Sequence, residues 1–362
     1  MRLIASITED RETTCRAAAW AHTGHDVIAM AVWSENKPML GEDAEPVLLL
    51  KEAERIGLVG VFDGLGGSGA GGIGRSIDGR LLRGAFIASR LAHLTVRQWF
   101  ADRVIGSEAG TDLKSRLAAV MQAARPARRT KVRGSLVRAL PTTIALMEFA
   151  GEGDHWRLTA RWAGDSRCFV ICPDQGMAQI SRDDSAEDDA LVNLIHDQPM
   201  LNVVSASEDF TINESGLTVT AGSIVMAATD GFFSWVLTPA LFEYHVLETL
   251  HSAADAPEWG RRLTAAVRSY TSDDASLSAA ALGYSSFTQV QKAFRPRYEH
   301  LRAHHWEPLA HARDGEAKTA ARHDSWDRYR DGYMRFLRDD REAAPEAEDD
   351  DLAVRARGEV NG

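Results

Sequence analysis

The chain has 362 residues, 44% of them hydrophobic and 26% charged, which is typical of a soluble globular protein with one large domain or two small ones. Its formal net charge of −11 argues against nucleic acid and anionic membranes as partners, because neither would be attracted to it electrostatically. Three cysteines in this length exclude a disulfide scaffold.

The N-terminal stretch MRLIASITEDRETTCR predicts no signal peptide, because its apolar run is short and acidic residues follow at once. No stretch of the sequence approaches the roughly 18 uninterrupted apolar residues of a transmembrane helix. We therefore expect a cytoplasmic protein.

Hydrophobic patterning places the first elements in chain order. Short apolar runs rich in β-branched residues predict strands at 26–33, 47–50 and 56–62. Helical periodicity then predicts helices over 75–104 and 112–124. We expect further strands at 142–149, 156–163, 166–172, 176–181, 210–219, 223–229 and 275–284, and helices at 184–196, 239–252 and 257–270. This order favours an α+β layered domain over a strictly alternating parallel sheet.

The composition changes after about residue 285, which suggests three parts. We expect a folded domain over 1–285, a charged helical extension over 286–340 and a disordered acidic tail over 341–362. The extension carries aromatic residues at helical spacing that would form one stripe, namely Trp326, Tyr329, Tyr333 and Phe336. This stripe would dock either on the main domain or on a partner protein.

Cys168 and Cys172 share parity on the predicted strand RCFVIC, so both side chains would point to one face. We interpret them as reduced thiols in the core. A metal or redox pair is the alternative, but the spacing lacks the usual CxxC pattern and no second cluster accompanies it.

Acidic clusters recur where strand-like runs reach a turn, at 41–43, 61–67, 163–167, 228–231 and 271–276. An Asp directly after an apolar strand places a carboxylate at the end of a sheet, and a following Gly lets the backbone turn. Taken singly, each Asp-Gly is an ordinary turn. Several such carboxylates converging in space would repel one another and need cations, and oxygen-only ligands favour Mg²⁺ or Mn²⁺.

The second cluster also fits a dinucleotide-binding fingerprint, since Gly64, Gly66 and Gly69 form GxGxxG after a strand. The acidic residue expected about 20 positions later, at the end of a second parallel strand, is missing, because Asp78 comes too soon. We therefore disfavour a nucleotide site.

The order and spacing of the clusters resemble the metal-dependent protein phosphatases of type 2C, the PPM-type serine/threonine phosphatases, in a bacterial-like form. The resemblance covers roughly residues 20–284. The segments that carry it are GEDA (41–44), VFDGLGG (61–67), LPTTIAL (140–146), WAGDSRCFVI (162–171), ISRDDS (180–185), MAATDGFFSW (226–235) and DDAS (273–276).

The resemblance implies a central β-sandwich of two antiparallel sheets flanked by helices, in four αββα layers. It also implies a hydrolase that removes phosphate from phosphoserine and phosphothreonine in proteins, with a substrate from a Ser/Thr kinase signalling pathway. By the same resemblance, Asp63 bridges two Mg²⁺ or Mn²⁺ ions, the Gly64 carbonyl completes one side, and Asp230 and Asp273 hold the other ion.

Three further carboxylates enter by the same resemblance. Glu42 and Asp43 would lie beside the ions, directly or through water, and Asp165 matches a position linked to a weaker third ion in some members. Asp274 is not the expected ligand of its pair, because the motif places the ligand first. Asp63 and Asp43 are the predicted catalytic residues. Two ions sharing Asp63 would lower the pKa of a bridging water, which attacks phosphorus in line.

The sequence departs from the family pattern where many members carry a phosphate-gripping Arg, four residues before Glu42. That position is Pro38 here, and the neighbouring Lys37 is either a substitute phosphate ligand or a solvated loop charge. Leu65 stands where other members have His. These losses keep open a catalytically weak or inactive regulatory or binding module, and, more remotely, an unrelated metal-dependent hydrolase.

Overall fold

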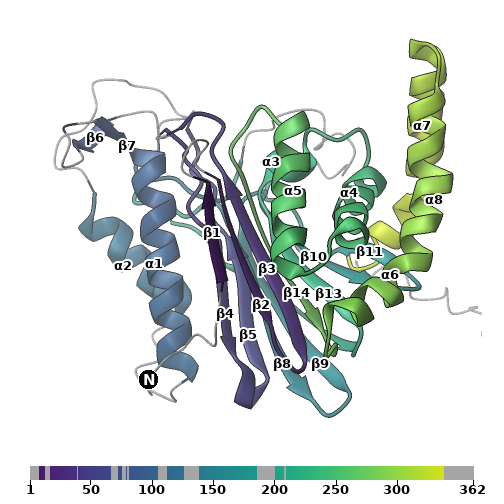
Figure 1. The fold of residues 1–362 in the computed structure, drawn as a ribbon. Coiled ribbons are helices and arrows are strands. Elements are labelled where there is room, and N and C mark those ends of the chain that lie inside the picture. Colours follow the sequence, from purple (N-terminus) through teal and green to yellow (C-terminus); the bar gives the residue numbers. More distant parts are fainter. Residues whose placement is uncertain are drawn as a thin grey trace, which may run out of the picture.

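The structure is a computed structural model that describes residues 8–12, 17–38, 40–66, 72–75, 79, 81–104, 112–125, 138–185, 200–207 and 209–337. In these ranges two antiparallel sheets pack face to face between two layers of helices (Figure 1). This confirms the predicted α+β sandwich with its αββα layering.

The larger sheet has seven strands in the order β1-β2-β3-β14-β13-β10-β11. Their bounds are β1 (Thr8–Glu12), β2 (Ala17–Thr23), β3 (Val27–Ser34), β14 (Ala275–Leu282), β13 (Ser223–Ala228), β10 (Arg167–Cys172) and β11 (Gly176–Gln179). The second sheet has five strands in the order β12-β9-β8-β5-β4. Their bounds are β12 (Asn213–Thr220), β9 (His155–Ala163), β8 (Ile144–Glu152), β5 (Ile56–Val61) and β4 (Val47–Lys51). A separate ribbon pairs β6 (Gly72–Arg75) with β7 (Leu81–Arg83).

Helices α1 (Gly84–Val104) and α2 (Leu113–Ala123) cover the five-stranded sheet (Figure 1). The outer face of the seven-stranded sheet carries the remaining described helices. They are α3 (Asp230–Phe233), α4 (Pro239–Ser252), α5 (Ala256–Tyr270), α6 (Phe287–Leu301), α7 (Glu307–His311) and α8 (Gly315–Tyr333), with a π-helical turn at Arg302–Trp306. In the described ranges no helix is both long enough and apolar enough to cross a membrane.

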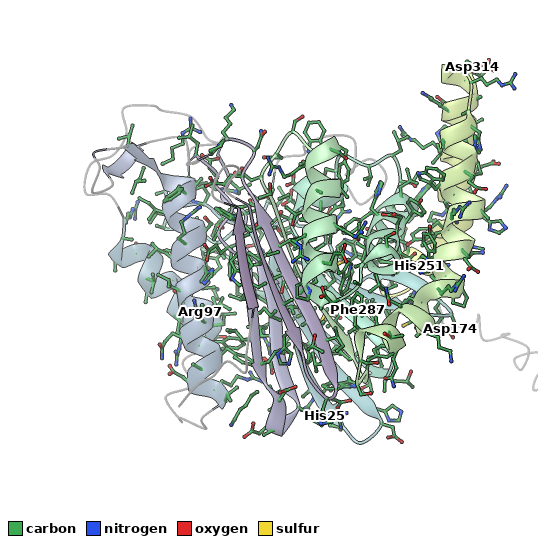
Figure 2. All side chains as sticks on the ribbon, in the orientation of Figure 1. His25, Arg97, Asp174, His251, Phe287 and Asp314 are labelled. Carbon is green, nitrogen blue, oxygen red and sulfur yellow. The ribbon has the colours of Figure 1, made fainter. Side chains whose placement is uncertain are left out.

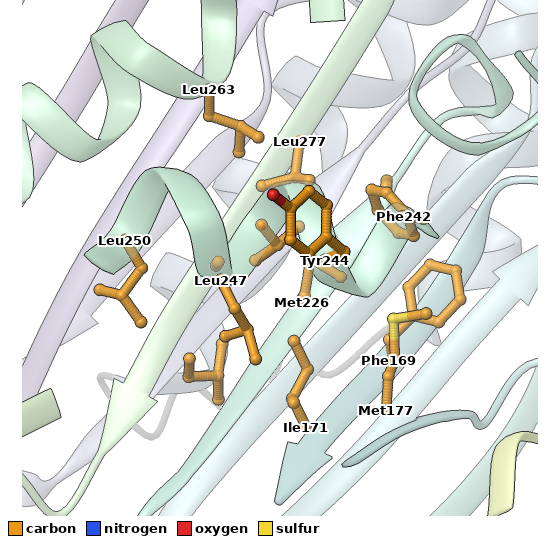
Figure 3. Packing of buried hydrophobic residues seen from close by; sticks show 14 of the residues in the cluster. Phe169, Ile171, Met177, Met226, Phe242, Tyr244, Leu247, Leu250, Leu263 and Leu277 are labelled. Atoms are coloured by element: carbon orange, nitrogen blue, oxygen red, sulfur yellow. The ribbon is translucent and has the colours of Figure 1, made fainter. Parts of the chain in front are cut away.

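Strand β3 shows why the sandwich forms, because it is buried on both faces. Val27 and Ala29 pack in the core between the two sheets, whereas Ile28 and Met30 pack in the core under the helices. Successive side chains of a strand point to opposite faces, so one apolar run serves two cores. Figure 3 shows the helix-side core, where residues of α4 and α5 lie over β13 and β10.

The predicted helix over 75–104 was wrong in its first part. The described residues before Gly84 belong to the β6–β7 ribbon, and Leu81 is 57% exposed rather than part of a buried helical stripe. Gly79 has a φ of +83°, a backbone conformation that suits glycine and interrupts a helix. In the predicted helix over 184–196, residues 184 and 185 are not helical, and 186–196 lie outside the described residues.

Strand β2 was missed because its sequence, AAAWAHT, is rich in alanine, which is depleted in strands. Helix α4 matches its predicted range. Cys168 is buried between the sheets, Cys172 packs against the same core, and both are free thiols, as predicted. Gly64 and Gly66 follow β5 in an antiparallel sheet, and the third fingerprint glycine, Gly69, lies outside the described residues. The next described helix begins at Gly84, so the described part of the fold gives no support to a dinucleotide site.

The aromatic stripe of the extension lies on α8 and the residues just after it. Trp326, Tyr329 and Tyr333 are buried in the helix-side core, whereas Phe336 is 41% exposed. The boundary at 285 stays a prediction, and the predicted acidic tail at 341–362 lies outside the described residues.

Leu247 on α4 is 1% exposed in the helix-side core, so Leu247→Ala should lower the free energy of unfolding by about 2–5 kcal/mol. Leu94 on α1 is 61% exposed, and Leu94→Ala should change it by less than about 0.5 kcal/mol. Chemical denaturation of both variants measures the difference. Equal losses would contradict the assignment of this core.

Candidate metal centre

The strand registers bring the acidic segments to one end of the sandwich. In the seven-stranded sheet Ala228, the last residue of β13, pairs with Arg167 at the start of β10. Ala275, the first residue of β14, pairs with Ser34, the last residue of β3. The loop after β3, the turn before β10, the turn after β13 and the approach to β14 therefore meet at the same end.

The five-stranded sheet adds its own segments at that end. Val61, the last residue of β5, pairs with Ala145, and Ile144 at the start of β8 pairs with Ala163 at the end of β9. Asp63 and the turn at Asp165 therefore join the loops of the other sheet. His25, in the turn between β2 and β3, lies at the opposite end of the sandwich (Figure 2).

Five aspartates gather there, and we call Asp43, Asp63, Asp165, Asp230 and Asp273 the acidic cluster. The pKa of Asp63 lies well above its usual range, first because of burial and then because of the charges of Asp43, Asp230, Asp165 and Asp273, in that order. Burial and neighbouring carboxylates likewise raise the pKa of Asp43 and of Asp165. Each carboxylate in the cluster makes ionisation of its neighbours less favourable.

Two threonines hold the main chain of Asp63. The Thr143 N–H and the Thr142 hydroxyl donate to the Asp63 carbonyl at 2.8 and 2.7 Å. The Asp63 N–H in turn donates to the Thr143 hydroxyl oxygen at 3.4 Å. The segment 140–146 thus fixes the backbone that carries the central carboxylate.

Asp43 is buried and lies against the turn after β13. The Thr229 hydroxyl donates to Asp43 Oδ2 at 2.9 Å, and the Trp33 indole donates to the Asp43 carbonyl at 3.2 Å. The Thr229 hydroxyl oxygen also accepts the Ser276 N–H at 2.9 Å. One hydroxyl therefore connects Asp43 to both β13 and β14.

The two aspartates before β14 have different surroundings. Asp274 Oδ1 accepts the Asn36 N–H at 2.8 Å, and its Oδ2 accepts the Glu42 N–H at 2.6 Å. Asp274 thereby fixes the loop that carries Glu42. Asp273 is exposed, and its Oδ1 accepts the Asp274 N–H at 2.8 Å.

Close backbone approach explains two glycines of the site. A Cβ on Gly231 would lie 1.9 Å from the Asp274 carbonyl oxygen, and a Cβ on Gly64 would lie 2.7 Å from the Glu42 carbonyl oxygen. Any larger residue would push apart the segments that carry the acidic cluster.

A divalent cation suits the chemistry of this cluster. Its donors are all carboxylate oxygens that repel one another, and Asp165 Oδ1 is buried without a hydrogen-bond partner in the described parts of the chain. Oxygen donors of this kind favour Mg²⁺ or Mn²⁺. As placed, however, no three His, Cys, Asp or Glu side chains of the described ranges could hold a metal ion together. Ligation by three of these side chains at once would need them to move from the positions shown.

The basic side chain predicted to bind phosphate and one that sequence reasoning missed have different surroundings. Lys37, the predicted phosphate ligand, is exposed in the loop after β3. Arg83 on β7 was missed by sequence reasoning, yet its Nη1 lies 3.1 Å from Glu42 Oε1 and its side chain is 58% exposed. Burial raises the pKa of Glu42, and Arg83 opposes that shift. Arg83 and Glu42 are 41 positions apart in the sequence, so only their contact in the folded structure identifies this arginine.

Comparison with solved structures places the fold. A phosphatase from Toxoplasma gondii superposes with a TM-score of 0.51 at 12% identity, covering 74% of this chain and 96% of the other. The PPM Ser-Thr phosphatase MsPP from Mycobacterium smegmatis gives a TM-score of 0.46 at 18% identity, covering 70% of this chain and 98% of the other. The chain therefore shares the fold of the Toxoplasma gondii phosphatase, with two antiparallel sheets flanked by helices.

The chain also matches PppA, described as a key regulatory component of T6SS in Pseudomonas aeruginosa, with a TM-score of 0.46 at 22% identity. That match covers 74% of this chain and 97% of PppA. RsbX was solved with magnesium, and the PstP catalytic domain with two manganese ions. No protein-family model and no curated protein matches the sequence.

The acidic cluster predicts an unusual response to charge removal. In EDTA at pH 7, Asp63→Asn should raise the melting temperature and should increase the free energy of unfolding by at least about 1 kcal/mol. The reason is that the substitution removes a negative charge that the neighbouring carboxylates disfavour. The gain should shrink toward pH 5, since the raised pKa lets the native Asp63 protonate before the unfolded chain does.

Asp174→Asn, in the exposed β10–β11 turn, is the matched control and should leave the melting temperature unchanged. A destabilised Asp63→Asn protein in EDTA would show that the cluster is not repulsive.

Proposed function

We propose that this chain is a metal-dependent protein serine/threonine phosphatase in which Asp63, Asp230 and Asp273 hold Mg²⁺ or Mn²⁺. The observation that carries the proposal is the acidic cluster, whose carboxylates raise one another's pKa at the end of the sandwich where loops of both sheets meet. Such a cluster is costly to fold unless cations neutralise it.

The other groups at this end of the sandwich have proposed roles beside Asp230 and Asp273. Asp63 and the Gly64 carbonyl would help to hold the ions, and Glu42 and Asp43 would act beside them, directly or through water. Asp165, with its unpartnered buried oxygen, suits a third ion. When bound, the ions supply an activated water at neutral pH and offset charge on the phosphoryl oxygens.

The chain's own residues hold this arrangement and orient the phosphate. Thr142 and Thr143 fix the Asp63 backbone, so the central carboxylate keeps its place against the repulsion of its neighbours. Arg83, exposed beside Glu42, offers a planar fork that matches two phosphate oxygens. Lys37 is a second candidate and would act as a point charge. The substrate would be a phosphoprotein from a Ser/Thr kinase pathway in the cytoplasm.

A binding or regulatory module is the second candidate function. Two observations favour it. In the described ranges no three His, Cys, Asp or Glu side chains are already placed to hold an ion together, and Pro38 stands where many members of the resembled family carry a phosphate-binding Arg. Such a module would bind Mn²⁺ or a phosphopeptide without turnover.

With Mn²⁺, the chain should hydrolyse p-nitrophenyl phosphate and a phosphothreonine peptide, and EDTA should abolish both activities. Asp63→Asn should lower kcat/KM by about 100-fold or more, because Asp63 is the shared ligand. Asp174→Asn should retain full activity. Hydrolysis that survives EDTA or Asp63→Asn would refute the proposal, and tight Mn²⁺ binding without turnover would favour the binding module.

Arg83→Ala should raise KM for the phosphothreonine peptide about tenfold or more, because a charge-assisted contact to phosphate is lost. Arg83→Lys should recover part of the loss, and Lys37→Ala should change KM by less than about threefold, since an ammonium is a point charge without the planar fork of Arg. Steady-state kinetics at saturating Mn²⁺ measures all three variants. A larger effect of Lys37→Ala would assign phosphate binding to Lys37 instead.

A further inference from the structure

The end of α8 is hydrogen-bonded to β10 and β11, the two strands that follow the Asp165 turn. Tyr333 is 1% exposed, its hydroxyl donates to Gln179 Oε1 at 2.7 Å, and it accepts a hydrogen bond from Arg167 Nη1 at 3.3 Å. Arg167 begins β10 and Gln179 ends β11. A residue of the C-terminal extension therefore bridges two strands beside the Asp165 turn.

Both hydrogen-bond partners of Tyr333 also donate to the Asp183 carboxylate. Arg167 forms a bidentate pair with Asp183, with Nε to Oδ1 at 2.9 Å and Nη2 to Oδ2 at 2.6 Å. Gln179 Nε2 donates to Asp183 Oδ1 at 3.1 Å. Arg167 is 1% exposed, so its charge depends on this geometry for compensation.

Asp184 carries the connection to the acidic cluster. Its Oδ2 accepts the Gly164 N–H at 3.0 Å, and its own N–H donates to the Gly164 carbonyl at 3.0 Å. Gly164 directly precedes Asp165 and has a φ of +103°, so these two bonds set the turn that presents the Asp165 carboxylate. The Arg182 guanidinium also donates to the carbonyl of Leu337, beyond the end of α8.

We propose that α8 is a positioning element of the metal centre, in which Tyr333 acts through Arg167, Gln179 and the 182–184 segment to hold the Asp165 turn. The C-terminal extension would then help to hold the metal centre in place. The consequence for metal affinity rests on the proposed phosphatase function, whereas the positioning itself does not.

Tyr329, one helical turn earlier, provides a matched control. Its hydroxyl is also buried and donates to Glu243 Oε2 at 2.6 Å, and Glu243 is paired with Arg297 on α6 at 2.7 Å. This network ties α8 to α4 and α6 and has no contact with the turn at Asp165 among its described hydrogen bonds. Tyr329→Phe therefore removes a comparable buried hydroxyl from the same helix without touching the proposed connection.

The test is hydrogen–deuterium exchange of the full-length, metal-free chain, followed in peptides covering 163–168 and 180–185. Tyr333→Phe should speed exchange of both peptides about three- to tenfold, the scale of one lost buried hydrogen bond, whereas Tyr329→Phe should leave them unchanged. The Mn²⁺ concentration for half-maximal p-nitrophenyl phosphate hydrolysis should rise by a similar factor in Tyr333→Phe alone.

Unchanged exchange in Tyr333→Phe, or equal changes in both variants, would overturn the positioning role. Faster exchange with an unchanged Mn²⁺ midpoint would overturn the link to the metal centre. The exchange result decides the positioning role even if the wild-type chain hydrolyses no phosphate ester. Should Tyr333→Phe fail to fold, exchange of the unmutated chain in low denaturant replaces it, and α8 opening independently of the two peptides would overturn the proposal.

Discussion

Repulsion among the carboxylates of the acidic cluster is the constraint on which the rest of the site depends. Two sheets that pack face to face bring their loops to one end, and the charges gathered there raise the pKa of Asp43, Asp63 and Asp165. Left to itself this repulsion would open the loops. The surrounding structure resists it with uncharged donors, such as the hydroxyls of Thr142 and Thr229, and with glycines that let backbones approach closely.

Under the proposed function, cations would relieve this repulsion. The same desolvation that makes the carboxylates unfavourable without ions makes their attraction to a divalent ion strong. Under the proposed function, stability and activity are therefore opposed at this end of the sandwich. The extension takes part in that balance, because Tyr333 and its partners hold the Asp165 turn from outside the acidic cluster.

Much of the fold could be predicted from the sequence, because the relevant signals are local. An apolar run followed by Asp-Gly marks a strand end at Asp63 and again at Asp230. The helical periodicity of apolar residues is enough to predict α4. The rest depends on contacts between distant segments. Arg83 on β7 contacts Glu42 from 41 positions away in the sequence, and Tyr333 contacts Gln179 across 154 positions. The helix expected over 75–104 was wrong in its first part, where Arg75 and Leu81–Arg83 belong to the β6–β7 ribbon instead.

The central claim is that the acidic cluster binds divalent cations through a shared Asp63. A crystal structure of the full chain grown with Mn²⁺, with data collected for anomalous scattering from manganese, tests it most directly. The account predicts two anomalous peaks that share the Asp63 carboxylate, one of them also contacting Asp230 and Asp273. No manganese peak at this end of the sandwich, in crystals that hold saturating Mn²⁺, would contradict it.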